Sequence, residues 1–236
     1  MKIITIGDIH GSHAWKTIKP GDWDNIIFIG DYVDSVFYHD KEIKKNLEEI
    51  IDLKKLYPEK VILLWGNHDL SYFFSGDERH YASGFRKNLL PDFLSLYTAN
   101  RKLFQAAFAI DHYLWTHAGV VQKWFNDYIA GQIKKSDRNL AFTLNRLFDA
   151  YYLPLFHVGR LRGGLNEKGG IFWADKSETE NDPLMGYHQI VGHTKTSSGV
   201  RVSNHYRADT TLTWVDCLET ETEFFKIELT GSQAST

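Results

Sequence analysis

The sequence predicts an α/β protein, and two patterns in its 236 residues support this fold class. First, short apolar runs end at glycine followed by aspartate or asparagine, as buried strands of a parallel sheet do. Second, an amphipathic segment lies between two of these runs. Strand, helix and strand in this order predict a parallel βαβ unit near the start of the chain. The composition, 43% hydrophobic and 24% charged, is that of an ordinary globular protein.

The first half of the chain supplies the clearest elements. Strands are expected at residues 2–6 (KIITI), 25–29 (NIIFI) and 61–65 (VILLW). Between the second and third strands, isoleucine and leucine recur at three- and four-residue spacing among lysines and glutamates. This spacing predicts a helix over residues 40–57, which Pro58 ends.

The second half mixes helical insertions with further strands. One helical stretch is expected over about 81–107, broken at Pro91, and another over about 122–152, with a polar break at 134–137. They belong to two insertions at about 71–107 and 122–155. Short strands bounded by polar turns are expected at residues 112–115, 171–173, 189–191, 211–216 and 224–229. No linker composition divides residues 1–236, so a single domain is predicted.

Charge and cysteine content exclude several classes of protein. Lysine and arginine number 27 against 30 acidic residues, so avid binding to nucleic acid or to an anionic membrane is disfavoured. Cys217 is the only cysteine, which rules out an intramolecular disulfide and a thiolate metal cluster. The apolar start is too short for a signal peptide, and no run reaches the ~20 apolar residues of a membrane span. A cytoplasmic protein is therefore predicted.

Five short motifs carry the chemistry, and each directly follows an apolar run. Each is weak evidence alone, but together they place carboxylate, amide and imidazole groups where parallel strands end and sites form. Carboxylate oxygen, amide oxygen and imidazole nitrogen suit Mn, Fe or Zn. The motifs are Asp8-Ile9-His10-Gly11, Gly30-Asp31-Tyr32-Val33-Asp34, Gly66-Asn67-His68-Asp69, Thr116-His117-Ala118-Gly119 and Val191-Gly192-His193-Thr194.

The five motifs in this order resemble the signature of the calcineurin-like metallophosphoesterases. The resemblance is strongest to the phosphoprotein-phosphatase branch, with its phage and bacterial Ser/Thr-phosphatase-like and diadenosine-tetraphosphatase-like members. The stretch IFWAD at 171–175 is similar to a stretch of that branch between the last two histidine motifs. The resemblance implies a four-layer sandwich of two mixed β-sheets flanked by helices, with the helical insertions capping a metal cleft.

The resemblance also implies a role for each matching residue. Two divalent transition-metal ions are expected, Mn before Fe or Zn, and a hydroxide that bridges them would attack phosphorus. His68 would protonate the leaving oxygen as general acid, Asp34 would support His68, and Asp69 would have a capping role. Asp8 and His10 would bind the first ion, Asp31 both ions, and Asn67, His117 and His193 the second.

Three departures from the family concern arginine. Ser35 and Trp65 stand where the branch has arginines, and none lies between Asp175 and His193. Phosphoryl transfer needs positive charge around the phosphate oxygens. Arg162 is the preferred substrate-binding residue; the alternatives are Arg79, Arg86 and Arg160.

The predicted function is metal-dependent hydrolysis of phosphomonoesters of the Ser/Thr-protein-phosphatase type, on a phosphoprotein or a nucleotide. The alternative is hydrolysis of nucleotides, dinucleoside polyphosphates or nucleic-acid phosphodiesters. A catalytically inactive binding scaffold is a third possibility, which the intact set of metal-ligand candidates disfavours.

Overall fold

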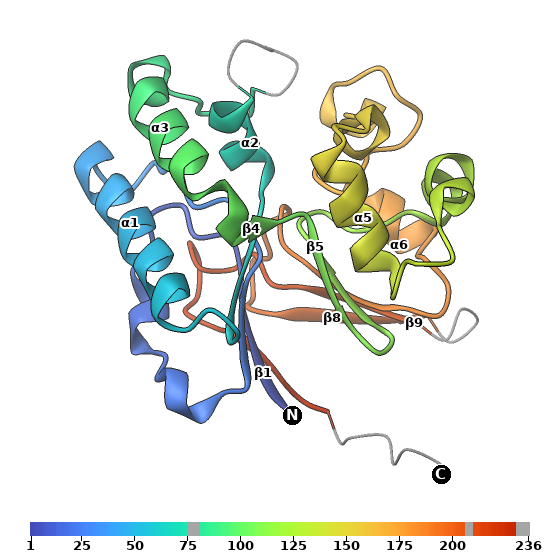
Figure 1. The fold of residues 1–236 in the computed structure, drawn as a ribbon, viewed down its shortest axis with the longest axis horizontal. Coiled ribbons are helices and arrows are strands. Elements are labelled where there is room, and N and C mark those ends of the chain that lie inside the picture. The colour runs from blue at the N-terminus through green and yellow to red at the C-terminus, as the bar shows by residue number, and fades with distance from the viewer. Residues whose placement is uncertain (75–80, 206–209, 230–236) are drawn as a thin grey trace.

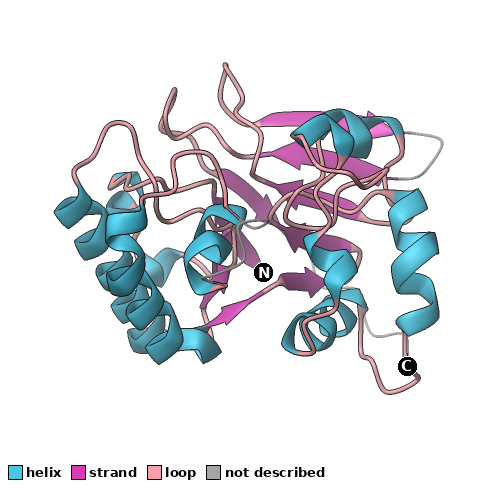
Figure 2. Ribbon diagram, turned by 90° about the horizontal axis from the view of Figure 1, so that it is seen from above, coloured by secondary structure: helices cyan, strands magenta, loops and turns pink. Residues whose placement is uncertain are grey.

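Two five-stranded sheets form the centre of the molecule, with helices on both outer sides (Figures 1 and 2). The computed structural model describes residues 1–74, 81–205 and 210–229, so Arg79 lies outside the described residues. Both sheets are mixed, which confirms the predicted architecture. In the first sheet only β10 runs antiparallel to its neighbour. Its strands, in spatial order, are β10 (Phe225–Glu228), β1 (Lys2–Ile6), β2 (Asn25–Phe28), β3 (Val61–Leu64) and β4 (Phe104–Gln105).

The second sheet has a parallel centre and antiparallel edges. Strands β6, β7 and β9 run parallel to one another, while β5 and β8 are antiparallel to theirs. In spatial order the strands are β5 (Ala107–Ile110), β6 (Tyr113–Thr116), β7 (His188–Val191), β9 (Thr210–Trp214) and β8 (Arg201–His205).

Helices cover the outer faces. Helices α1 (Asp40–Leu56), α2 (Asn67–Phe73) and α3 (Leu90–Asn100) lie on one side in Figure 1. On the other side lie α5 (Leu140–Asp149) and α6 (Lys176–Asn181). The short α4 (Gln122–Trp124) precedes them. No helix among the described residues has the length and apolarity to cross a membrane.

Side-chain alternation along the strands builds two apolar layers. In β1, Ile4 and Ile6 join the cluster beneath the helices, whereas Ile3 joins a smaller cluster that also contains Trp115 of β6. Thr5 lies on the Ile3 face and accepts a hydrogen bond from Trp115 Nε1 at 2.9 Å. The two sheets are therefore joined by apolar packing and by a buried hydrogen bond between them.

The predicted elements were partly wrong in the second half. Residues 171–173 form turns rather than a strand, because the N–H groups of Trp173 and Ala174 donate back to the Gly170 carbonyl, both at 2.9 Å. The helix predicted over 81–107 is confined to α3, and Pro91 lies in its first turn, where proline is tolerated, instead of breaking it. Strands β4, β5 and β8 were not predicted. The helix at 40–57 and the polar break at 134–137 are confirmed.

Candidate metal centre

Six strand ends bring the polar motifs together at one edge of the two sheets. The turns after β1, β2 and β3 carry the first three motifs, and the turns after β6 and β7 carry the last two. The strand β9 adds Asp216, two residues beyond its end. A cavity of about 430 Å³ lies here, lined by Asp8, His10, Asp31, Asp34, Asn67, His68, His193 and Asp216 among others. His117 is fully buried beside it.

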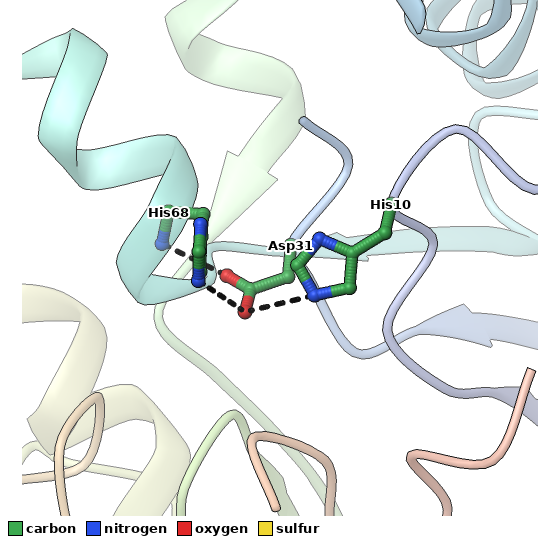
Figure 3. Close-up of side chains that lie close together, drawn as sticks. All are labelled: His10, Asp31 and His68. Carbon is green, nitrogen blue, oxygen red and sulfur yellow. Dashed lines mark hydrogen bonds and ion pairs between the residues drawn. The ribbon is translucent and has the colours of Figure 1, made fainter. Parts of the chain in front are cut away.

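Asp31 lies at the centre of this group. Its Oδ2 atom is 3.4 Å from His117 Nε2, 3.8 Å from His10 Nε2 and 4.0 Å from His68 Nε2. Figure 3 shows the rings of His10 and His68 on either side of the Asp31 carboxylate. Potential ligand atoms fall into two compact triplets that share this residue: His10 with Asp31 and His68, and Asp31 with His117 and His193.

Backbone carbonyls orient two of the histidines. His10 Nδ1 is 2.8 Å from the carbonyl of Val33, and His117 Nδ1 is 3.0 Å from the carbonyl of Ile29. When such a ring is neutral and donates from Nδ1, its Nε2 atom carries the lone pair that can bind a metal ion. Both Nε2 atoms face Asp31.

Asn67 is the second point of convergence. Its Oδ1 atom lies 2.8 Å from His117 Nε2 and 2.8 Å from His193 Nδ1. The other ring nitrogen of His193, Nε2, is buried and has no hydrogen-bond partner among the described residues. Burial lowers the pKa of His193 well below its usual value, with the charges of His117 and Arg162 acting the same way. The imidazole is therefore neutral, as a metal ligand must be.

Three buried carboxylates crowd the same space. Burial and the charges of Asp216 and Asp31 raise the pKa of Asp8 well above its usual value. Burial raises the pKa of Asp216 to about 6. Like charges held together away from water are costly unless a cation neutralises them. Together with the unpartnered His193 nitrogen, this crowding fits a site for divalent cations.

His68, a member of the first triplet, also forms a hydrogen-bonded pair with Asp34. His68 Nδ1 lies 3.0 Å from Asp34 Oδ2. Burial acts to lower the pKa of His68, but the charge of Asp31 and the hydrogen bond to Asp34 outweigh it and raise that pKa to about 9. The other Asp34 oxygen accepts a short hydrogen bond from the Tyr72 hydroxyl. A protonated imidazole with a fixed orientation is the arrangement that a general acid needs.

Asp69 fixes the turn that carries Asp31. Its Oδ2 atom accepts from the backbone N–H of Asp31 at 2.8 Å and of Gly66 at 2.9 Å. Its Oδ1 atom accepts from Tyr32 N–H at 3.0 Å and from the Tyr97 hydroxyl at 2.5 Å. Asp69 thus caps the first turn of α2 and ties two strand ends together.

Backbone strain concentrates at this edge. His10, Asp31, Asp34 and His193 all have positive φ angles, between 40° and 63°. Non-glycine residues adopt this region rarely and at a cost of ~1–3 kcal/mol each, mostly where the fold forces it for function.

The sequence profile of the calcineurin-like phosphoesterases matches residues 1–211, which covers most of the chain and all five motifs. The chain belongs to this family. Its members are hydrolases of phosphoric esters.

Individual relatives are more distant than the family match. A candidate serine/threonine-protein phosphatase of Schizosaccharomyces pombe is 36% identical over 72 residues, which are 28% of this chain and 22% of the yeast protein. The match therefore spans about a fifth of the length of that relative. Two crystal structures of a cold-active protein tyrosine phosphatase share the fold. One has a TM-score of 0.57 at 19% identity, covering 96% of this chain and 73% of that one. The other, a point mutant of a cold-active protein tyrosine phosphatase, has a TM-score of 0.51 at 18% identity, covering 89% and 70%.

Among the described residues, two arginines line the phosphoesterase cavity. Arg162 donates from Nη2 to Thr194 Oγ1 at 2.5 Å and lies 2.9 Å from Asp175 Oδ2 through Nε. Arg86 also lines the cavity and donates to the backbone carbonyl of Ser35. Arginine is therefore supplied beside the second motif by another segment of the chain. Arg160 is exposed and does not line this cavity.

The two expected insertions contribute unequally to the cleft. Ser83, Gly84 and Arg86 of the first insertion line the cavity, whereas residues 122–155 contribute nothing to its lining. Instead, α5 packs on β5, where the Asn145 side chain bonds the backbone of Ala107. Arg162 and Trp173, which follow the second insertion, complete that side of the cavity.

Sequence reasoning missed Tyr72, Trp173 and Asp216 at this site. Asp216 offered the same signal as the five motifs, because it follows the apolar run at 211–215. Tyr72 lies one helical turn after His68, so a helix beginning at Asn67 places it on the same face. For Trp173 no local pattern distinguished a cavity residue from a core residue.

Proposed function

We propose that this phosphoesterase hydrolyses phosphomonoesters with Ser/Thr-protein-phosphatase-like chemistry, using two divalent transition-metal ions. The observation that carries the proposal is Asp31, which belongs to both candidate ligand triplets, with His68 of the first triplet hydrogen-bonded to Asp34. Asp8 and His10 would hold one ion, Asn67, His117 and His193 the other, and Asp31 both. When bound, the ions supply Lewis acidity and lower the pKa of a coordinated water. Mn is the proposed metal, because oxygen and imidazole ligands suit it, with Fe and Zn as alternatives.

Four side chains would bind the phosphate or supply and orient the proton for the leaving oxygen. Arg162 is held beside His193 by Asp175 and Thr194, so its remaining donors can bind phosphate oxygens without first being ordered. His68 donates its proton to the leaving oxygen, and Asp34 keeps the ring oriented and charged. Tyr72 prevents the Asp34 carboxylate from turning away.

Arginine content favours a monoester over a diester as substrate. Ser35 and Trp65 replace arginines of the related branch, which would weaken the binding of a dianionic monoester. Trp65 is fully buried among aromatic side chains, 4.6 Å from the ring of Phe104, and does not line the cavity. Arg86, which is paired with Asp40, and Arg162, which is paired with Asp175, line the cavity from other directions. A dianionic monoester gains more from two guanidinium groups than a monoanionic diester does.

A panel of substrates and metals tests this proposal. The purified chain is assayed on an alkyl monoester, an aryl monoester and a bis-aryl diester, with Mn, Fe, Zn or Mg added in turn. We expect monoester kcat/KM to exceed diester kcat/KM, and activity to depend on metal. Faster hydrolysis of the diester would favour the alternative function. Full activity after treatment with a chelator would contradict metal dependence.

We also propose that residues 1–236 form one domain, because one apolar cluster includes residues from Ile4 to Leu184. The cytoplasm stays the predicted location. The buried free thiol of Cys217 is consistent with a reducing compartment.

A further inference from the structure

A second cavity of about 520 Å³ adjoins the metal centre, and its lining differs in character. The metal cavity is lined mainly by charged and polar side chains, whereas aromatic and aliphatic groups dominate the second. The two cavities share Arg162 and Trp173. The other lining residues include Tyr81, Leu153, Phe156, His157, Leu165 and Asn166.

The shared residues are fixed at the boundary. Trp173 packs edge-on against His193, with ring centroids 5.8 Å apart. Arg162 is anchored by its contacts with Asp175 and Thr194. A phosphate group held by Arg162 in the metal cavity therefore has the second cavity directly beside it.

A chain of aromatic contacts joins the second cavity to the proposed general acid. Tyr81 stacks on Phe85 at 4.2 Å, and Phe85 packs against Tyr72 at 4.7 Å. The Tyr72 hydroxyl bonds Asp34, the partner of His68. The Tyr81 side of the second cavity is thus linked through packed side chains to Asp34, the partner of the proposed general acid.

Two features of the second cavity indicate that an organic group binds there. Leu165 and Leu153 are 92% and 53% exposed, so apolar surface at the rim remains in contact with water. His157 lines the same cavity and places an imidazole among the apolar side chains. A ring bound there would shield the leucines from water, and a polar group on the ring would meet the His157 imidazole.

We propose that the second cavity binds the aromatic leaving group of an aryl phosphomonoester, such as a tyrosyl phosphate. The ring packs among Tyr81, Phe156 and Trp173, and a polar group beyond the ring bonds His157. The volume lies within the range of small-molecule sites and exceeds that of one ring. This inference rests on the proposed function and specifies its substrate class.

Phosphonates test the subsite without the complication of leaving-group reactivity. Benzylphosphonate and ethylphosphonate carry the same charge, and neither is hydrolysed. Their inhibition constants are measured against p-nitrophenyl phosphate in the metal-loaded protein. We expect benzylphosphonate to bind at least tenfold more tightly than ethylphosphonate. Equal inhibition constants would overturn the subsite, while hydrolysis of an alkyl phosphate in the same preparation would show that the proposed function stands.

Substitutions in the second cavity test whether the preference for benzylphosphonate arises there. Leu165→Asp places a charge on the apolar rim and should reduce the benzyl-to-ethyl preference at least fivefold. The control Leu56→Asp makes the same change at an exposed leucine, 69% exposed, at the end of α1. It should leave the preference unchanged. His157→Phe should weaken binding of a phosphonate analogue of a tyrosyl peptide more than that of benzylphosphonate. Loss of preference in both leucine variants, or in neither, would contradict the assignment.

Discussion

The hydroxyl of Tyr72 offers a sharp test of the proposed general acid. It donates to one oxygen of Asp34, whose other oxygen lies 3.0 Å from His68 Nδ1, and it accepts the Arg86 backbone N–H at 3.0 Å. Burial and the Asp34 charge raise the Tyr72 pKa well above its usual value, so the hydroxyl keeps its proton and remains a donor. In Tyr72→Phe the bond from the tyrosine hydroxyl is lost. Of these two contacts, only the one with His68 then orients the Asp34 carboxylate.

The magnitude follows from the kind of bond that is lost. A hydrogen bond to a charged group contributes ~1.5–3 kcal/mol, and each ~1.4 kcal/mol of barrier is tenfold in rate. We expect kcat for an alkyl monoester to fall about 10- to 100-fold, because its leaving oxygen needs a correctly placed proton. The unpartnered Arg86 N–H should lower the free energy of unfolding by ~1–3 kcal/mol.

The assay compares kcat for an alkyl monoester and for p-nitrophenyl phosphate, with metal content and unfolding measured on the same samples. The p-nitrophenyl ester should lose far less, because its leaving group needs little protonation. Tyr152→Phe is the matched control, since its hydroxyl donates to the Tyr128 carbonyl at 3.1 Å on the surface. Equal losses on both esters, or no loss in a folded and metal-loaded variant, would refute the role of Tyr72 in positioning Asp34.

Four further predictions follow from named contacts. Asp31→Asn should retain fewer than two metal ions per chain, measured by metal analysis, because Asp31 is common to both ligand triplets. Two tightly bound ions with normal turnover would disprove this. His68→Asn should lower kcat by ~10²–10⁴, more for poor leaving groups than for good ones. Arg162→Ala should lower monoester kcat/KM about tenfold or more, whereas Ser35→Arg should not raise it, because Ser35 is buried and Arg86 already contacts its carbonyl. Asp137 has a pKa held below its usual value by hydrogen bonds from Arg146 and the Lys134 N–H. The stability that it adds is present above about pH 4, the usual pKa of a free aspartate, and is lost on acidification. The difference in Tm between wild type and Asp137→Asn should therefore shrink below that pH.

The sequence predicted those parts of the site that follow strands directly. Each motif lies after a short apolar run, and parallel strands end at one edge, so convergence followed from topology alone. Asp8 and His193 are 185 residues apart, yet the His193 backbone N–H lies 2.9 Å from an Asp8 carboxylate oxygen. The positions of the five motifs after the strands were enough to predict that Asp8 and His193 lie close together.

Features that depend on tertiary contacts could not be predicted from local sequence patterns. Arg86 reaches Ser35 from 51 residues away, and nothing in the spacing of either residue indicated this contact. The edge strand β8 (RVSNH) carries little apolar alternation, because an edge strand needs only one partner and one buried face. Ile171 and Phe172 are apolar and buried, and burial alone does not distinguish a strand from a packed turn.

The glycines at the strand ends give this site an unusual sensitivity to mutation. A Cβ atom on Gly66 would overlap the Asp31 carboxylate, and one on Gly192 would overlap that of Asp8. Neither glycine has a side chain that could take part in the chemistry. In a random-mutagenesis screen for lost turnover, both positions would nevertheless behave like ligand positions, since even alanine displaces the carboxylate that each glycine adjoins. At each of these two strand ends, the missing side chain of a glycine provides the space that a candidate ligand carboxylate occupies.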